Sequence, residues 1–307
     1  MRIIITGACG HIGSYLVENI YKIKKIKEVI LIDNFHSNNY QPIFNLNKKI
    51  KYSFFKINVN ENNSLNNFNR IDLVIHCASY TNAENSFTLK KEMYKNNINC
   101  MKNVISFCLK KKAKLFHLST ASVYGKQTKI VNENDDSFLR PQSPYADIKL
   151  IEEKLLKKNQ KKLSYMSFRL GTIAGVSKGM RFHTAINKFC LNAGLNHKIE
   201  IYKTAYNQYR PYLSLGDLFQ TFKHCVENNI YKNDIYNVLS GNYTVKQIVN
   251  EIKKHKSKVK IKFVNSAIMN KLSYLVDDSK IKSLGVKFNS KIEIDIKETL
   301  NLLSTLK

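Results

Sequence analysis

The chain has 307 residues, a length that allows one large core or two modest ones, and we expect one compact unit with a secondary lobe. Its formal net charge is +27, but only six of its 50 basic residues are arginine and the lysines are spread along the whole chain, which is typical of a solvated surface and not of a nucleic-acid-binding patch. The six cysteines and eight histidines show no metal-ligand or disulfide spacing and no apolar run could span a bilayer, so we expect a cytoplasmic protein with reduced thiols, no metal, and no nucleic-acid or membrane partner.

Short β-branched runs alternate with helical patterns through the first half of the chain. The predicted strands cover residues 3–6, 28–33, 50–56, 72–76, 115–119 and 165–170, and the predicted helices include 13–24, 93–111 and 145–158. This alternation is typical of βαβ units in a parallel sheet. We therefore expect an α/β fold, with a Rossmann-type doubly wound parallel sheet over residues 1–170.

The pattern becomes less regular after residue 170. Helices are predicted at 184–195, 216–228 and 244–254, and short strands near 199 and 236. No linker rich in proline or serine separates the two halves. We expect residues 171–307 to form a smaller, mixed substrate-binding lobe, with segments near 210–240 returning to the first domain.

Three glycines follow the first predicted strand, in the stretch TGACGHIGS (6–14). They allow a tight turn, a close approach of the backbone to a diphosphate at the helix N-terminus, and close packing of helix on strand. Asp33 closes the second predicted strand, where a carboxylate suits a free ribose diol and repels a 2′-phosphate. The pattern predicts a dinucleotide site that prefers NAD to NADP. The residues predicted to form it are Gly7, Gly10, His11, Ile12, Gly13 and Asp33.

A Tyr-x-x-x-Lys pair places both side chains on one face of a helix, but the spacing alone is weak because it occurs three times, at Tyr21, Tyr52 and Tyr145. Tyr21 lies on the first predicted helix and Tyr52 on a predicted strand. Tyr145 instead opens a helix that would pass near the carboxyl ends of the strands. Position therefore favours Tyr145, with Lys149, as the catalytic pair.

The stretch FHLSTASVYG (116–125) runs off the end of a predicted strand, twenty residues before Tyr145. Together with TGACGHIGS, it resembles the short-chain dehydrogenase/reductase superfamily, in its extended branch of nucleotide-sugar epimerases and dehydratases. Further matches carry the resemblance over nearly the whole chain: HCAS at 76–79, NINCMKNV from 97, YRPYLSLGD at 209–217, YNVLSGNYT from 236 and DDSKIKSLG from 277.

The resemblance implies roles for individual residues. It implies a catalytic set of Thr120, Tyr145, Lys149 and Asn97. It adds cofactor contacts from Asn34, Asn58, Val59, Ala78 and Lys149. Its substrate contacts would be Thr120, Ser122, Tyr145, Thr172, Arg181 and Arg210, with Arg210 on the substrate diphosphate. Asn58 and Thr172 depart from the family pattern, which has aspartate and asparagine there. His183, near Arg181, is expected to be a satisfied core residue.

The implied reaction is oxidation of a sugar hydroxyl by NAD. A tyrosinate can take the hydroxyl proton if its pKa falls from about 10 towards 7, and the Lys149 ammonium favours that form. We expect an NAD-dependent nucleotide-sugar epimerase that acts on a hexose, at C4, through a keto-sugar. The alternatives are a 4-dehydrogenase that releases the keto-sugar and, with less support, a non-catalytic protein that senses NAD or a nucleotide.

The resemblance also bears on dehydration and on assembly. Dehydrating relatives place Asp-Glu immediately after the catalytic threonine, whereas this chain has Ala121 and Ser122, so we expect no 4,6-dehydration. The nearest acids, Glu133, Asp135 and Asp136, are expected to be solvated in a polar loop. Family members dimerise through the two helices predicted at 93–111 and 145–158, so a homodimer is expected.

Overall fold

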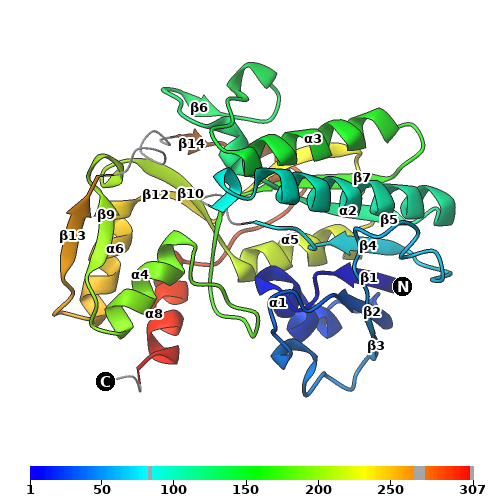
Figure 1. The fold of residues 1–307 in the computed structure, drawn as a ribbon, viewed down its shortest axis with the longest axis horizontal. Coiled ribbons are helices and arrows are strands. Elements are labelled where there is room, and N and C mark those ends of the chain that lie inside the picture. Colours follow the sequence, from blue (N-terminus) through cyan, green and yellow to red (C-terminus); the bar gives the residue numbers. More distant parts are fainter. Residues whose placement is uncertain (82–84, 266–273, 305–307) are drawn as a thin grey trace.

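A central sheet of seven parallel strands organises the computed structural model, which describes residues 1–81, 85–265 and 274–304. The strand order is β11-β7-β5-β4-β1-β2-β3 (Figure 1). The strands are β1 (Arg2–Thr6), β2 (Glu28–Asp33), β3 (Lys51–Lys56), β4 (Leu73–His76), β5 (Lys114–Thr120), β7 (Tyr165–Leu170) and β11 (Asp234–Val238). The chain runs outward from β1 to β3 and then returns to build the other half, which confirms the doubly wound parallel sheet.

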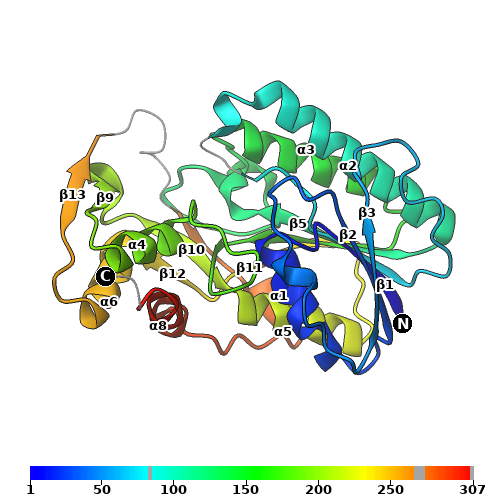
Figure 2. The ribbon, with the colours of Figure 1, turned by 60° about the horizontal axis from the view of Figure 1, so that its bottom comes forward.

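Helices cover both faces of the sheet (Figure 2). One face carries α1 (His11–Asn19) and α5 (Leu215–Glu227), and the other carries α2 (Lys90–Lys111) and α3 (Pro144–Asn159). Strand periodicity sends alternate residues to the two faces: Ile3 and Ile5 pack with α1 and α5, whereas Ile4 packs with α2. Each fully buried isoleucine contributes about 1.5–3 kcal/mol, so a slip of one residue in register would be strongly unfavourable.

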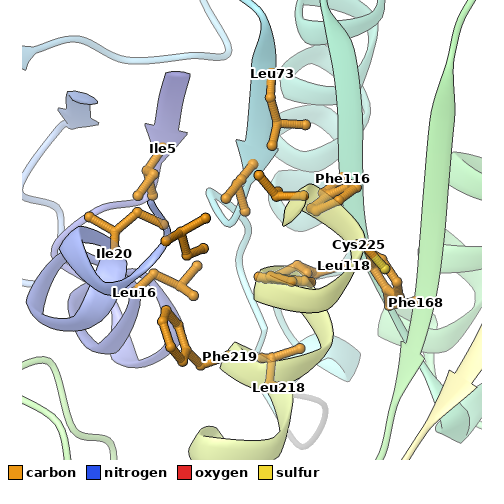
Figure 3. Packing of buried hydrophobic residues seen from close by; sticks show 14 of the residues in the cluster. Ile5, Leu16, Ile20, Leu73, Phe116, Leu118, Phe168, Leu218, Phe219 and Cys225 are labelled. Atoms are coloured by element: carbon orange, nitrogen blue, oxygen red, sulfur yellow. The ribbon is translucent and has the colours of Figure 1, made fainter. Parts of the chain in front are cut away.

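Aromatic residues fill the centre of the layer between the sheet and α5 (Figure 3). The Phe116 ring lies 5.3 Å from Phe168 and 5.2 Å from Phe222, measured between ring centroids. These rings join β5, β7 and α5, which come from three distant parts of the sequence. They thereby fix the strand end that carries Thr120.

The second lobe is built from small sheets and a helical layer, at the left of Figure 1. Its sheets are β12-β10-β8, β13-β9 and β14-β6. Their strands are β6 (Ile130–Val131), β8 (Thr172–Ala174), β9 (Ile199–Tyr202), β10 (Tyr209–Ser214), β12 (Gly241–Thr244), β13 (Ile261–Val264) and β14 (Leu275–Val276). Its helices are α4 (Ala185–Gly194), α6 (Val245–His255) and α8 (Ile292–Leu302), whereas α7 (Ser279–Lys282) packs against β11 of the large sheet. Since β11 joins the large sheet while β10 and β12 belong to the lobe, the chain passes between the two parts repeatedly.

Short 3₁₀ turns complete the described elements. They are η1 (Ile20–Lys22), η2 (Gln41–Ile43), η3 (Asn85–Phe87), η4 (Ala121–Tyr124), η5 (Asp136–Phe138) and η6 (Lys203–Ala205). The predicted helix 13–24 is shorter than expected, because α1 ends at Asn19 and continues as η1. Within the described part of the chain, no helix is both long and apolar enough to cross a bilayer.

Candidate active site

Steric limits explain two of the three glycines, Gly7 in the loop after β1 and Gly13 in the first turn of α1. Gly7 has a positive φ of 64°, and a Cβ there would lie 2.6 Å from the backbone nitrogen of Ala78. A Cβ on Gly13 would lie 2.1 Å from the Gly7 carbonyl oxygen. The loop therefore tolerates no side chain at either position, and it leads directly into α1 at His11. Its backbone and the N-terminus of α1 fit a bound diphosphate.

A cleft of about 1000 Å³ opens beside this loop, at the carboxyl ends of β1, β2 and β4. Its lining includes Gly7, Gly10, Asp33, Asn34, Asn58, Val59, Ala78 and Arg181. Most of the predicted cofactor contacts therefore share one cavity, at the crevice where open α/β sheets bind their ligands.

Asp33 lines the cleft with its carboxylate held from both sides. Its Oδ2 accepts a hydrogen bond from the Cys9 backbone at 2.9 Å, and its Oδ1 accepts one from the Phe35 backbone at 2.8 Å. An ionised carboxylate has further lone pairs, so it can still accept from a ribose hydroxyl. Beside it, the Asn34 amide lies 3.4 Å from Asn58 Oδ1, which places the departure at Asn58 on the cleft wall.

The His11 side chain serves the structure rather than the cleft. It is 6% exposed, its Nδ1 lies 2.7 Å from Ser177 Oγ, and its Nε2 lies 3.3 Å from Asn187 Nδ2. Burial lowers the pKa of His11 to about 3, with Arg181 adding to the shift. Ile12 packs against the apolar core of the sheet. What these two residues can offer a cofactor is their backbone N–H groups.

Residues 177–183, which we call the strap, cross from the second lobe onto the glycine loop. The Gly179 backbone donates to Ser14 Oγ at 2.8 Å. A Cβ on Gly179 would lie 2.4 Å from the Gly10 carbonyl oxygen and 2.5 Å from that of Cys9. Two backbones thus meet with no room for a side chain, and the strap forms one wall of the cleft.

Arg181 extends from the strap into the cleft. Its guanidinium donates to Thr81 Oγ1, and its carbonyl oxygen accepts from Asn187 at 2.9 Å. Burial lowers the pKa of Arg181, while Tyr145 and Asp33 act in the opposite direction. The residue therefore lies beside the glycine loop, between the Asp33 and Tyr145 ends of the site, and not in a separate substrate pocket.

Thr120 and Ser122 follow the carboxyl end of β5. The Thr120 hydroxyl lies 2.9 Å from the Ser122 hydroxyl and accepts from the Ser122 backbone at 3.2 Å, which starts η4. Ala121, between them, is buried. The pair presents hydroxyl groups and no carboxylate at this strand end.

Tyr145 and Lys149 lie one turn apart at the start of α3, which Ser143 caps and Pro144 opens. The Lys149 ammonium is 6.0 Å from the centre of the Tyr145 ring. Burial raises the pKa of Tyr145; Lys149 and Arg181 act against that rise and Glu152 adds to it. Burial acts to lower the pKa of Lys149, but Glu152 and Tyr145 hold it above its usual value.

Neither the predicted catalytic set nor the pair Thr172 and Arg210 lines the cleft. Asn97 fastens the segment after β4, because its amide exchanges hydrogen bonds of 2.9 and 3.0 Å with the Tyr80 backbone. Thr172 and Arg210 lie on neighbouring strands of the β12-β10-β8 sheet, where Thr172 pairs with Tyr212. Asn97 thus holds its segment in place, and Thr172 and Arg210 share one sheet of the second lobe.

Two expectations from the sequence are wrong. Glu133 is not solvated: its oxygens accept from the backbone and side chain of Asn237 at 2.9 and 2.8 Å, and burial raises its pKa. His183 is not a core residue, since it is exposed at the rim of the cleft. The partner of Glu133, Asn237, lies about a hundred residues further along the chain, which the local pattern does not reveal.

Two buried glutamates on α3 were missed altogether. Glu153 forms an ion pair with Arg169 at 2.7 Å, and Glu152 forms one with Lys149 at 2.7 Å. The available signal was two adjacent acids on a helix that needs a sheet-facing side, where an acid requires a buried partner.

Comparison with known proteins adds a family match and several relatives. Residues 3–238 match the family described as the NAD dependent epimerase/dehydratase family. The dTDP-D-glucose 4,6-dehydratase of Dictyostelium discoideum is 31% identical over 276 residues, 81% of this chain and 62% of that protein. The ADP-L-glycero-D-manno-heptose-6-epimerase of Brachyspira hyodysenteriae is 29% identical over 252 residues, 78% of this chain and 76% of that protein. The chain thus matches less than two thirds of the length of the first of these relatives.

Solved structures with the same fold cover the chain almost completely. The UDP-glucose 4-epimerase of Thermus thermophilus, in complex with NAD, has a TM-score of 0.85 at 20% identity and covers 99% of both chains. Pal from Bacillus thuringiensis has a TM-score of 0.88 at 22% identity and covers 100% of both chains. At these identities the likeness shows the fold, with its second lobe included.

Proposed function

Because the chain belongs to the NAD dependent epimerase/dehydratase family, we propose that it is a nucleotide-sugar 4-epimerase, which oxidises a hexose at C4 and returns the hydride to the opposite face of the keto-sugar. The enzyme class and the cofactor, NAD, come with the family. The observation that carries the finer proposal is the Tyr145–Lys149 pair on α3, with the hydroxyl groups of Thr120 and Ser122 at the neighbouring strand end.

The described residues fit the cofactor. Side chains at Gly7 and Gly13 would clash with the backbone of Ala78 and of Gly7, so the loop keeps its shape only with glycine there, and Asp33 stands where a ribose diol would bind. NAD supplies the hydride acceptor when it is bound. The strap carries Arg181 to the same cavity, which gives the cradle a guanidinium suited to a diphosphate.

The chain's own residues supply the proton transfer. Tyr145 accepts the proton of the sugar hydroxyl, and Thr120 orients that hydroxyl by a hydrogen bond. Lowering a tyrosine pKa by three units requires roughly 4 kcal/mol at 1.36 kcal/mol per unit. Lys149 provides part of this in a site shielded from water, where a cation acts more strongly than in bulk solvent.

Dehydration is not part of the proposed activity. Eliminating water across C5 and C6 needs an acid and a base beside the keto-sugar. The positions after Thr120 are Ala121, which is buried, and Ser122, which is hydrogen-bonded to Thr120. Neither can act as a carboxylate.

The test is product analysis. The NAD-loaded protein is incubated with a panel of UDP- and GDP-hexoses and followed by proton NMR, with Tyr145→Phe as the inactive control. We expect one sugar to give its C4 epimer with no net NADH. A 4-keto-6-deoxy product would identify a dehydratase, and NADH formed in proportion to sugar would identify a dehydrogenase; either result would overturn the proposal.

A further inference from the structure

A buried carboxylate lies behind the proposed catalytic pair and has no part in the reaction outlined above. Glu152 follows Lys149 by three residues on α3, and its Oε2 accepts from Lys149 Nζ at 2.7 Å and from His117 Nε2 at 2.8 Å. The exposed fractions of the Glu152, Lys149 and His117 side chains are 1%, 4% and 0%. A carboxylate is costly to bury without partners, and here one of its oxygens accepts from both Lys149 and His117.

The hydrogen bonds determine the protonation of this cluster. An ionised carboxylate only accepts, so His117 Nε2 carries the proton that it donates to Glu152. The other ring nitrogen of His117, Nδ1, lies 2.9 Å from Ser167 Oγ, so both nitrogens of this buried ring have a partner. Burial acts to raise the pKa of Glu152, but Lys149 and His117 hold it below its usual range. The cluster therefore holds the Glu152 carboxylate directly against the Lys149 ammonium.

We infer that Glu152 is a positioning residue, which holds the Lys149 ammonium in place and whose negative charge sets the pH at which Tyr145 loses its proton. The inference deepens the proposed function and rests on it for its catalytic meaning. Lys149 favours the Tyr145 phenolate, whereas Glu152 opposes it, so the two charges partly cancel at the tyrosine. Glu152 thus keeps Lys149 charged and at the same time limits how strongly Lys149 can stabilise the Tyr145 phenolate.

Five other titratable or charged groups surround Lys149, Glu152 and Tyr145, and they come from each of the elements that pack against α3 here. They are His76 on β4, Cys77 after it, Cys100 on α2, His117 on β5 and Arg181 on the strap. Burial lowers the pKa of His76 to about 3 and raises the pKa values of the Cys77 and Cys100 thiols to about 12, so all three are neutral near pH 7. The charges that act on Tyr145 are then Lys149, Glu152 and Arg181.

The test reads the ionisation of Tyr145 directly. The NAD-loaded protein is labelled with tyrosine carrying ¹³C at the ζ-carbon, and the Tyr145 resonance is the one that Tyr145→Phe removes. In Glu152→Gln we expect the titration midpoint of Tyr145 to fall by roughly one pH unit, because an opposing charge has been removed from a shielded site. If the protein turns over sugar, the acid limb of its kcat/KM profile should move to lower pH with it.

Glu153→Gln is the matched control, since Glu153 is equally buried on the same helix but is paired with Arg169. It should leave the Tyr145 midpoint in place. An unchanged midpoint in Glu152→Gln, or an equal shift in Glu153→Gln, would overturn the inference.

If Glu152→Gln does not fold, Lys149→Met is compared with the double variant Lys149→Met/Glu152→Gln, which buries no unpaired charge at these positions. The double variant must have the lower Tyr145 midpoint, and equal midpoints would overturn the inference. Because this reading needs no turnover, a protein inactive on every sugar would contradict the proposed function while the titration still tests the role of Glu152.

Discussion

Asp33 joins cofactor choice to the order of the glycine loop, since one carboxylate both faces the cleft and accepts two backbone N–H groups. Because the Asp33 carboxylate is already held in place, it can repel the 2′-phosphate of NADP without any rearrangement of the loop. Residues of this kind could be predicted from the sequence, because strand, glycines and acid lie within one βαβ unit. Glu152 could not, since its partner His117 lies 35 residues away and becomes its neighbour only when β5 and α3 pack together.

The first prediction concerns Asp33. NAD should bind more tightly than NADP, and Asp33→Ala should narrow that ratio by roughly tenfold, because the repulsion of a 2′-phosphate is removed. Calorimetry with both cofactors measures the ratio. Asp33→Asn serves as the control for lost hydrogen bonds, since it keeps an acceptor without the charge. Tighter binding of NADP to the unmodified protein would contradict the assignment.

The second prediction concerns Tyr145. Tyr145→Phe should bind NAD nearly as before but lose about two orders of magnitude or more in turnover, as expected for a positioned base. The matched controls are the other two tyrosines of the same spacing. Tyr52 donates to the Val17 carbonyl at 3.2 Å, and the Tyr21 ring lies near the ammonium groups of Lys22 and Lys49. If either control variant lost turnover while Tyr145→Phe kept it, the choice of Tyr145 would be wrong.

At the scale of elements, local pattern predicted the strands of the large sheet to within a few residues, because buried parallel strands are short, apolar and β-branched. It gave no element after residue 254, although α8 places Ile292, Ile296 and Leu300 on one buried stripe. This short stripe is explained only by α4 and α6, which lie across from it. The strap could not be predicted from the sequence either, because it is defined by its contact with the glycine loop, which is distant in the sequence.

The strap gives the third prediction. Gly179→Ala should weaken NAD binding by about tenfold or more and lower the free energy of unfolding by about 1–3 kcal/mol. The reason is that the new Cβ would lie 2.4 Å from the Gly10 carbonyl oxygen and 2.5 Å from that of Cys9. Calorimetric titration and thermal unfolding measure the two effects. Gly10→Ala is a milder comparison within the same contact, since its nearest neighbours lie at 3.3 Å. Unchanged NAD affinity in Gly179→Ala would show that the strap is not part of the NAD site.

Three buried groups with large pKa shifts, His11, His76 and Asp295, contribute to the response of the whole molecule to acid. Burial holds the pKa values of His11 and His76 at about 3, well below the ordinary value near 6.5, so the unfolded chain binds more protons at these positions between pH 6.5 and 3. Burial raises the pKa of Asp295 to about 7, so there the folded chain binds more protons between pH 3.8 and 7. Two groups therefore lower the free energy of unfolding on acidification, and one opposes them.

The fourth prediction follows from this balance. Between pH 7 and pH 5 the melting temperature should fall. One net extra proton bound by the unfolded chain lowers the free energy of unfolding by up to about 1.4 kcal/mol per pH unit. Asp295→Asn should make that fall steeper, because it removes the opposing contribution while keeping an acceptor for Ser214. A shallower pH dependence in Asp295→Asn would contradict the assigned signs.

The fifth prediction is the homodimer, which remains an expectation from the family resemblance. Some of the apolar side chains of α2 and α3 are buried within a single chain, since Met93 and Ile98 of α2 pack against Ile148 of α3. Tyr94, 47% exposed, is an apolar group that α2 leaves available to a partner. Light scattering at micromolar concentration should give twice the monomer mass of 35.6 kDa, and the monomer mass would contradict the expectation.

The strap also has a consequence for the rate at which the cofactor can be exchanged. Opening that wall of the cleft means separating Gly179 from Ser14, Ser177 from His11, and the Lys178 carbonyl from Asn39. Because these contacts also join the second lobe to the first, we expect release of the nucleotide to require that the two lobes separate at the strap. The proposed epimerase would regain NAD in every cycle, so slow exchange of the cofactor would not limit its turnover, and the residence time of bound NAD should report how often the two lobes separate.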